Sequence, residues 1–211
     1  MLKSINSPID MTQGKPWQSI LKFTLPMLIG NIAQQLYSTV DSIVVGHYIG
    51  DGALASVGSV LPILNMLLVL FIGISAGVGI MVAQYFGAKS REDLSETIGN
   101  CITITALCSV FIALLSMVIV RPMLEMLNTP ESIMGWCESY LLISMVGGAG
   151  MAFYNILSGI IRGLGDSFSA LIYLLVACVV NIILDIYFVK ELHMGVAGVA
   201  LATVISQFIS A

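Results

Sequence analysis

A carboxylate inside an apolar segment restricts how this chain can fold more than any other feature. Residues 177–203 predict an apolar helix that carries Asn181 and Asp185, then a short polar turn and a second apolar helix that carries Thr203. Asn181 and Asp185 are four residues apart, so they share one helix face. An ionisable side chain in a membrane helix normally faces a bundle interior or a water-filled cavity. The rest of the chain is therefore expected to supply a cavity and partners for Asp185.

The composition is that of a membrane protein. Of the 211 residues, 58% are hydrophobic and 9% are charged, whereas soluble domains contain about 25% charged residues. The sequence therefore predicts an all-α, polytopic helix bundle in a lipid bilayer. Because there is no basic patch, nucleic acid is excluded as a partner. The four cysteines form no CxxC pair and predict neither a disulfide framework nor a zinc site.

Short polar turns divide the chain into six predicted helices. A polar N-terminal tail (1–16) precedes helices at approximately 20–47, 54–86, 94–120, 133–161, 168–189 and 196–211. A spanning helix needs about 20 apolar residues, and the last segment has only 16. We therefore expect the chain to be a fragment that is cut inside its sixth helix.

The first helix carries a polar stripe and a proline. Pro26 lies inside the segment 20–47 and predicts a kink or bend there. Asn31, Gln34, Ser38 and Asp41 follow at spacings of three and four, which places them on one helix face.

The distribution of basic residues predicts the orientation. The N-terminal side holds six of the eight basic residues, and the other side holds two: Lys3, Lys15, Lys22, Lys89, Arg91 and Arg162, against Arg121 and Lys190. Since Lys and Arg accumulate on the cytoplasmic side, the N-terminus is predicted to be cytoplasmic.

With this orientation, five polar side chains from four helices fall into one layer. Counting along each helix places Asp41, Tyr140, Asn181, Asp185 and Thr203 roughly 7–13 Å from the outer end. Such a layer favours a functional site over isolated surface capping, although a lone Asp41 at this depth would also suit a capping or snorkelling role.

The chain resembles the N-terminal half of a multidrug and toxic compound extrusion (MATE) transporter. The resemblance rests on four ordered segments: LPMLIGNIAQQLYSTVDSIVVGHYIGDGALASVG, AQYFGAKSRED, RGLGDS and NIILDIYFV…GVAGVALATVISQ. Two acids in the layer are most similar to the DinF-like branch. The resemblance implies twelve helices in two pseudo-symmetric lobes, of which this chain would supply the first and lack the C-terminal lobe.

The resemblance also implies a function and a site. It implies an antiporter, not an enzyme, in the plasma (inner) membrane, which uses H+ or Na+ to export small cationic or amphiphilic compounds and needs no cofactor. The family's N-lobe cation site corresponds to five residues: Asp41, Tyr140, Asn181, Asp185 and Thr203. If the ion is Na+, its ligands are expected from Asp41, Asn181, Asp185 and Thr203.

The residues suggest a mechanism for such a site. Two neighbouring buried carboxyl groups disfavour double ionisation. We hypothesise that Asp41 and Asp185 take up the cation from outside and that loading favours one helix packing, through a bend at Pro26. Gln34 and Ser38 are expected to line the substrate cavity or to act in gating. Drug release follows if drug and cation compete or bind different states.

Three alternatives remain at this point. Gly163–Asp166 matches the GxGD motif of intramembrane aspartyl proteases, but no second Asp occurs in the preceding helix. A lipid or polysaccharide flippase of the same superfamily would be expected to have a cationic cavity, whereas this layer is acidic. The third alternative is a membrane fragment with no activity of its own.

Overall fold

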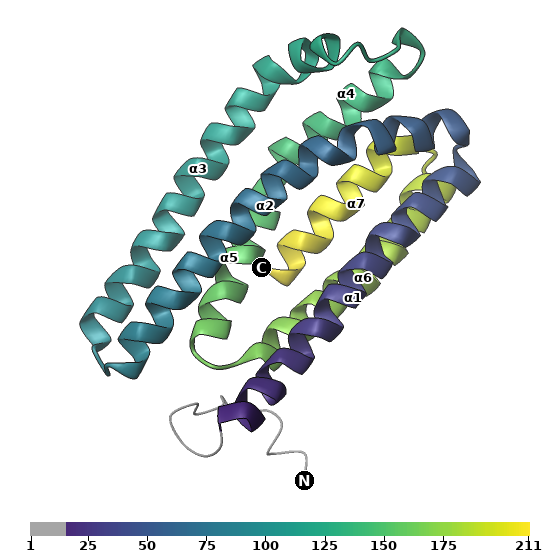
Figure 1. The fold of residues 1–211 in the computed structure, drawn as a ribbon. Helices are drawn as coiled ribbons and strands as arrows, with labels where there is room; N and C mark the ends of the chain where they lie inside the picture. Colours follow the sequence, from purple (N-terminus) through teal and green to yellow (C-terminus); the bar gives the residue numbers. More distant parts are fainter. Residues whose placement is uncertain (1–15) are drawn as a thin grey trace.

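The chain folds into a bundle of helices (Figure 1). The computed structural model describes residues 16–211, so the predicted tail 1–16 lies, except for Pro16, outside the described residues. The described part contains no strand, and the predicted all-α class is confirmed. Its elements are α1 (Pro16–Tyr48), α2 (Asp51–Gly87), α3 (Arg91–Met126), α4 (Glu131–Val146), α5 (Gly148–Gly163), α6 (Ser167–Ile186), a π-helix η2 (Tyr187–Glu191) and α7 (Gly195–Ser210).

Short turns connect the helices at two opposite ends of the bundle. The turns at 49–50, 127–130 and 192–194 define what we call the Gly50 end, and those at 88–90 and 164–166 define the Gly165 end (Figure 1). Gly50 and Gly165 have φ angles of 114° and 90°. Glycine adopts these angles without a steric cost, which lets the chain reverse within two or three residues.

The helix predicted at 133–161 is two helices. The chain breaks at Gly147, and α4 and α5 are bent by 44° relative to each other. The run Gly147-Gly148-Ala149-Gly150 provides little helix propensity. Gly147 also lies against Val204 of α7 so closely that a Cβ atom would clash. The break therefore lets α4 and α5 pack around α7.

Only some of the predicted membrane-spanning helices are both long enough and apolar enough to cross a bilayer by these two criteria alone. Among the described residues, three helices meet both criteria for a membrane span: α2, α3 and α6 together with η2. The bent pair α4–α5 also meets them if it is counted as one span. At about 1.5 Å per residue, α1 is long enough with its 33 residues, but its polar stripe lowers its hydropathy. α7 is a shorter apolar helix of 16 residues.

The helices pack as two groups around α7. α1 lies along α6, α2 lies along α5, and α7 contacts α4, α5 and α6 in the middle (Figure 1). Small residues permit the close approach of α2 and α5, because a Cβ atom at Gly159 would meet Ser75. The Ser75 hydroxyl also donates a hydrogen bond to the Asn155 carbonyl at 2.5 Å.

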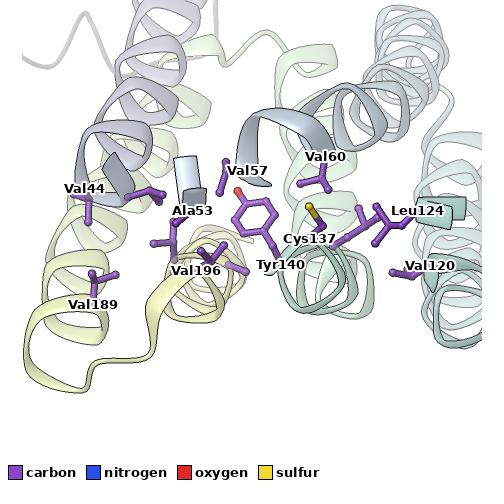
Figure 2. Packing of buried hydrophobic residues seen from close by; sticks show 14 residues of the cluster. Val44, Ala53, Val57, Val60, Val120, Leu124, Cys137, Tyr140, Val189 and Val196 are labelled. Carbon is purple, nitrogen blue, oxygen red and sulfur yellow. The ribbon is translucent and has the colours of Figure 1, made fainter. Parts of the chain in front are cut away.

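The main apolar core lies towards the Gly50 end. Fourteen buried residues from α1, α2, α3, α4, η2 and α7 form one cluster (Figure 2). Within it, Val45, Leu141 and Val199 are completely buried. Tyr140 is part of the same cluster. This core therefore fixes the relative positions of the helices that carry the predicted polar layer.

Candidate functional site

Asn181 and Asp185 lie in the interior of the bundle. Both side chains on α6 are fully buried, and Asp41 on α1 is 7% exposed. α6 packs against both α1 and α7. The four-residue spacing on α6 thus points Asn181 and Asp185 inward, while the lipid-facing residue Ile183 between them is 60% exposed.

The amide of Asn181 links the two carboxylates. With its nitrogen towards the acids, Asn181 donates to Asp41 Oδ1 at 2.9 Å and to Asp185 Oδ2 at 3.2 Å. This orientation is assigned from the surrounding donors and acceptors. The other end of the amide lies 3.5 Å from the Thr203 hydroxyl. One NH₂ group therefore places the two acids side by side.

The acid pair needs a positive partner. Asp185 Oδ1 is buried and has no hydrogen-bond partner among the described residues. Both carboxyl groups lie within hydrogen-bonding distance of the one Asn181 nitrogen, which brings them close to each other. Two adjacent buried negative charges without a counter-ion are costly. The arrangement is thus suited to holding one proton or another cation.

Tyr140 and Thr203 complete the predicted layer. Tyr140 on α4 is 5% exposed. Thr203 on α7 is half-buried and donates to the Val199 carbonyl at 3.0 Å. The structure therefore brings the five predicted residues together from α1, α4, α6 and α7, and their role in cation binding stays a prediction.

A cavity of about 120 Å³ adjoins Asp41. Asp41, Tyr140 and Thr203 are on its wall, together with the predicted cavity residues Gln34 and Ser38. Apolar side chains supply much of the remaining wall: Val57, Leu61, Leu64, Leu68, Met151 and Val204. Asn181 and Asp185 do not line this cavity. Asp41 therefore stands between the cavity and the buried α6 pair.

Pro26 lies away from this site. It precedes Asp41 by 15 residues on α1, which is about 22 Å along a helix axis, and it is not on the cavity wall. Any effect of Pro26 on the acids must therefore pass through movement of α1.

Six further polar residues of the cavity wall were not predicted from the sequence: Tyr37, Ser42, Asn65, Ser144, Asn155 and Gln207. Tyr37 precedes Asp41 by one helical turn and Gln207 follows Thr203 by one turn, so the same spacing rule could have identified both. Tyr37 has a buried hydroxyl and Gln207 a buried amide oxygen, each without a described partner. Conversely, Asn31 belongs to the predicted stripe but is exposed and lies outside the cavity.

The GxGD motif has a structural role in this fold. Asp166 accepts hydrogen bonds from the backbone nitrogen of Ser169 at 2.9 Å and from its hydroxyl at 2.6 Å. It therefore caps the N-terminus of α6. No acid pair forms at this turn in the described part of the chain.

The orientation of the Asn181 amide also decides which oxygen atoms face the acid pair. Na+ would need several oxygen ligands, and the assigned amide orientation directs the Asn181 oxygen to Thr203, away from the acids.

A family model identifies the chain. The MatE model matches residues 26–187, which is most of the sequence. The chain belongs to the MATE family. This confirms the resemblance that was based on the sequence segments.

Curated relatives of this MATE chain are longer proteins. "Probable multidrug resistance protein YoeA" of Bacillus subtilis is 31% identical over 94% of the chain and 44% of its own length. "DNA damage-inducible protein F" of Escherichia coli is 30% identical over 90% of the chain and 42% of its own length. The chain therefore spans less than half the length of these relatives.

Solved structures agree with the fold. A MATE structure described as being in the bent conformation matches with a TM-score of 0.87 and 26% identity, over 93% of this chain and 44% of that one. A transporter of the MOP superfamily from Pyrococcus furiosus, described by a reverse polarity of its binding pocket, matches with a TM-score of 0.89 and 25% identity, over 97% and 46%. The MATE chain thus has the fold of about one half of each.

Proposed function

We propose that this chain is the N-terminal lobe of a cation-coupled antiporter that exports cationic and amphiphilic compounds. The observation that carries the proposal is the buried pair Asp41 and Asp185, linked by Asn181 beside a cavity with largely apolar walls. A wall that combines apolar side chains and neutral polar groups with one carboxylate suits a hydrophobic cation, because it provides both burial and charge neutralisation.

The proposed coupling ion is H+. The neutral Asn181 amide donates to both acids, and neither acid forms a described salt bridge with a basic side chain. A proton shared by the pair removes one of the two negative charges without requiring further ligands. Na+ remains the alternative coupling ion.

The proposed cycle follows from the position of Asp41. A cationic cargo in the cavity meets Asp41 on the wall, whereas Asp185 lies behind it. Protonation of the pair weakens the attraction for the cargo, and cargo binding favours loss of the proton. Each ligand therefore lowers the affinity for the other, which is the linkage that antiport requires. We propose that a change in the bend of α1 at Pro26 couples the exchange of proton and cargo to a change in how the helices pack.

The flippase alternative is less well supported. The cavity wall carries Asp41 and no basic side chain. A negative cavity repels the phosphate of an anionic lipid carrier and attracts a cation. The cavity charge thus favours export of cationic compounds.

The proposed location is the plasma membrane with the N-terminus in the cytoplasm. Among the described residues, Lys22, Lys89, Arg91 and Arg162 belong to the Gly165 end, and Arg121 and Lys190 to the Gly50 end. The positive-inside rule places the Gly165 end in the cytoplasm. Protons would then reach the acid pair from the Gly50 end.

The test measures proton release on cargo binding. The purified chain in lipid nanodiscs is mixed with the fluorescent organic cation ethidium in a weakly buffered solution, and a pH indicator reports the protons. We expect binding to release up to one proton per ethidium and to weaken as the pH falls. Asp185→Asn and Asp41→Asn are expected to abolish the release.

Asp51→Asn is the matched control, because Asp51 is an exposed acid at the start of α2 outside the cavity. Release that persists in both acid variants, or is lost equally in the control, contradicts the proposal. Replacing choline chloride by sodium chloride at constant ionic strength tests the alternative ion. Displacement of ethidium by Na+ without any proton release would assign the coupling to Na+.

A further inference from the structure

A second concavity lies at the Gly165 end, apart from the acidic cavity. This groove, which we call the basic groove, has a volume of about 1220 Å³ and is formed by α1, α2, α3, α5 and the turns at 88–90 and 164–166. It shares no residue with the cavity beside Asp41. The proposed antiport cycle does not use it.

The charge of the groove is entirely positive. Lys89, Arg91 and Arg162 line it, and no Asp or Glu does. In the described part of the chain, salt bridges involve only Arg121 and Lys190 as the basic partners, both at the Gly50 end. The three groove cations therefore have no described acidic partner.

Two of the neighbouring acids make hydrogen bonds elsewhere, and the exposed acid Glu92, next to Arg91, does not line the groove. Asp93 accepts a hydrogen bond from the Ser90 hydroxyl, and Asp166 accepts from Ser169 at the start of α6. These contacts hold both carboxylates on their own turns. An external anion would thus find three cationic side chains available at one end of the groove.

The remaining wall is apolar. α1 contributes Phe23 and Met27, and α2 contributes Ile80 and Phe86. Ile80 is 60% exposed and Phe86 is 52% exposed, so these side chains leave a hydrophobic surface uncovered. The groove therefore combines an apolar trough with a cationic end, which is the pattern of an amphiphile with an anionic head.

We propose that the basic groove binds an anionic phospholipid. Its phosphate lies among Lys89, Arg91 and Arg162, and its acyl chains lie along α1 and α2 towards the bilayer centre. Basic pockets between membrane helices on the cytoplasmic side are suited to such headgroups. The proposal goes beyond the antiporter function and assigns opposite charge preferences to the two hollows: cations beside Asp41 and anions in the groove.

The test compares two lipids that differ only in headgroup charge. The purified chain in mild detergent is titrated with phosphatidylglycerol or phosphatidylcholine of identical acyl chains, and bound lipid is counted by native mass spectrometry. We expect phosphatidylglycerol to bind at least tenfold more tightly. The triple variant K89Q/R91Q/R162Q is expected to lose this preference.

A matched control removes the same charge elsewhere. The variant K22Q/R121Q/K190Q neutralises three basic side chains that do not line the groove, and it should keep the preference. A second variant, Ala83→Trp, fills the groove at an exposed wall position and leaves its charges intact. It should weaken phosphatidylglycerol binding several-fold. Circular dichroism and size exclusion establish that each variant is folded.

Several results would overturn the proposal. These are equal affinities for the two lipids, an equal loss in the control triple variant, or full competition by glycerol phosphate, which would indicate an anion site without a lipid. Lipid-free dimers that Ala83→Trp dissociates would show that a second copy covers the groove. Asp185→Asn should leave lipid binding intact, so failure of the antiport proposal is distinguishable from failure of this one.

Discussion

At the scale of single residues, Asn181 holds the acid pair together. It is completely buried and is the only described side chain that donates to both Asp41 and Asp185. Without this amide, two buried carboxyl groups would lack their shared donor. A buried acceptor left without a partner costs about 1–3 kcal/mol. The residue therefore contributes to stability as well as to the geometry of the proposed site.

We expect Asn181→Leu to lower the free energy of unfolding by about 1–3 kcal/mol, because leucine has the branched shape of asparagine but no donor. Thermal unfolding of the purified chain in detergent measures the change. Asn65→Leu makes the same replacement at an exposed amide on the cavity wall and should change stability little. Equal effects of the two variants would show that the acids do not depend on Asn181.

At the scale of helices, the contact between α2 and α5 depends on residues without side chains. A Cβ atom at Gly79 would lie 3.0 Å from the Gly159 carbonyl oxygen, and one at Gly163 would lie 2.6 Å from the Gly79 carbonyl oxygen. Backbones that approach this closely gain van der Waals contacts in lipid, where the hydrophobic effect does not drive helices together. Gly79, Gly159 and Gly163 all line the basic groove, so the α2–α5 contact supports the wall of that groove.

Gly159→Ala should therefore destabilise the bundle by about 1–3 kcal/mol, since overpacking forces the helices apart. Gly77→Ala is the control, because a Cβ atom there meets nothing within 4 Å. It should be neutral, or stabilising by up to about 1 kcal/mol through helix propensity. The comparison uses the unfolding midpoint of each variant, and a stable Gly159→Ala protein would argue against the close contact.

At the scale of the whole molecule, charge divides the bundle along its axis. The acid pair lies in the interior, and the basic groove lies at the Gly165 end. In the membrane potential and in the anionic cytoplasmic leaflet, this distribution favours one orientation. That orientation decides from which side protons would reach Asp41 and Asp185.

The orientation predicts the accessibility of single cysteines. In intact cells, Asp51→Cys should react with a membrane-impermeant maleimide, and Arg91→Cys should react only after the cells are opened. Both positions are exposed and lie at opposite ends of the bundle. The unmodified chain provides the background from its four native cysteines. The reverse labelling pattern would invert the proposed topology.

The sequence by itself determined the helical class and the approximate helix positions. In lipid, backbone groups must be satisfied within each segment, so long apolar runs leave helices as the solution for this chain. Helical spacing also placed Asp185 with Asn181, and Asp41 with Gln34 and Ser38, on common faces. These features depend on neighbours in the chain, and they can be derived without knowing any contact between helices.

Only the tertiary structure decided how the helices are rotated and where they break. The exposure of Asn31, the break at Gly147 and the cavity position of Asn155 depend on contacts between residues far apart in sequence. The helix breaks at Gly147, which packs closely against Val204 of α7, and α5 approaches α2 where Gly159 lies against Ser75. A polar stripe is wider than the arc that a neighbouring helix covers, so periodicity alone cannot select its buried members. The packing of helices that are distant in sequence decides which residues of the stripe become buried, and the sequence pattern does not contain that information.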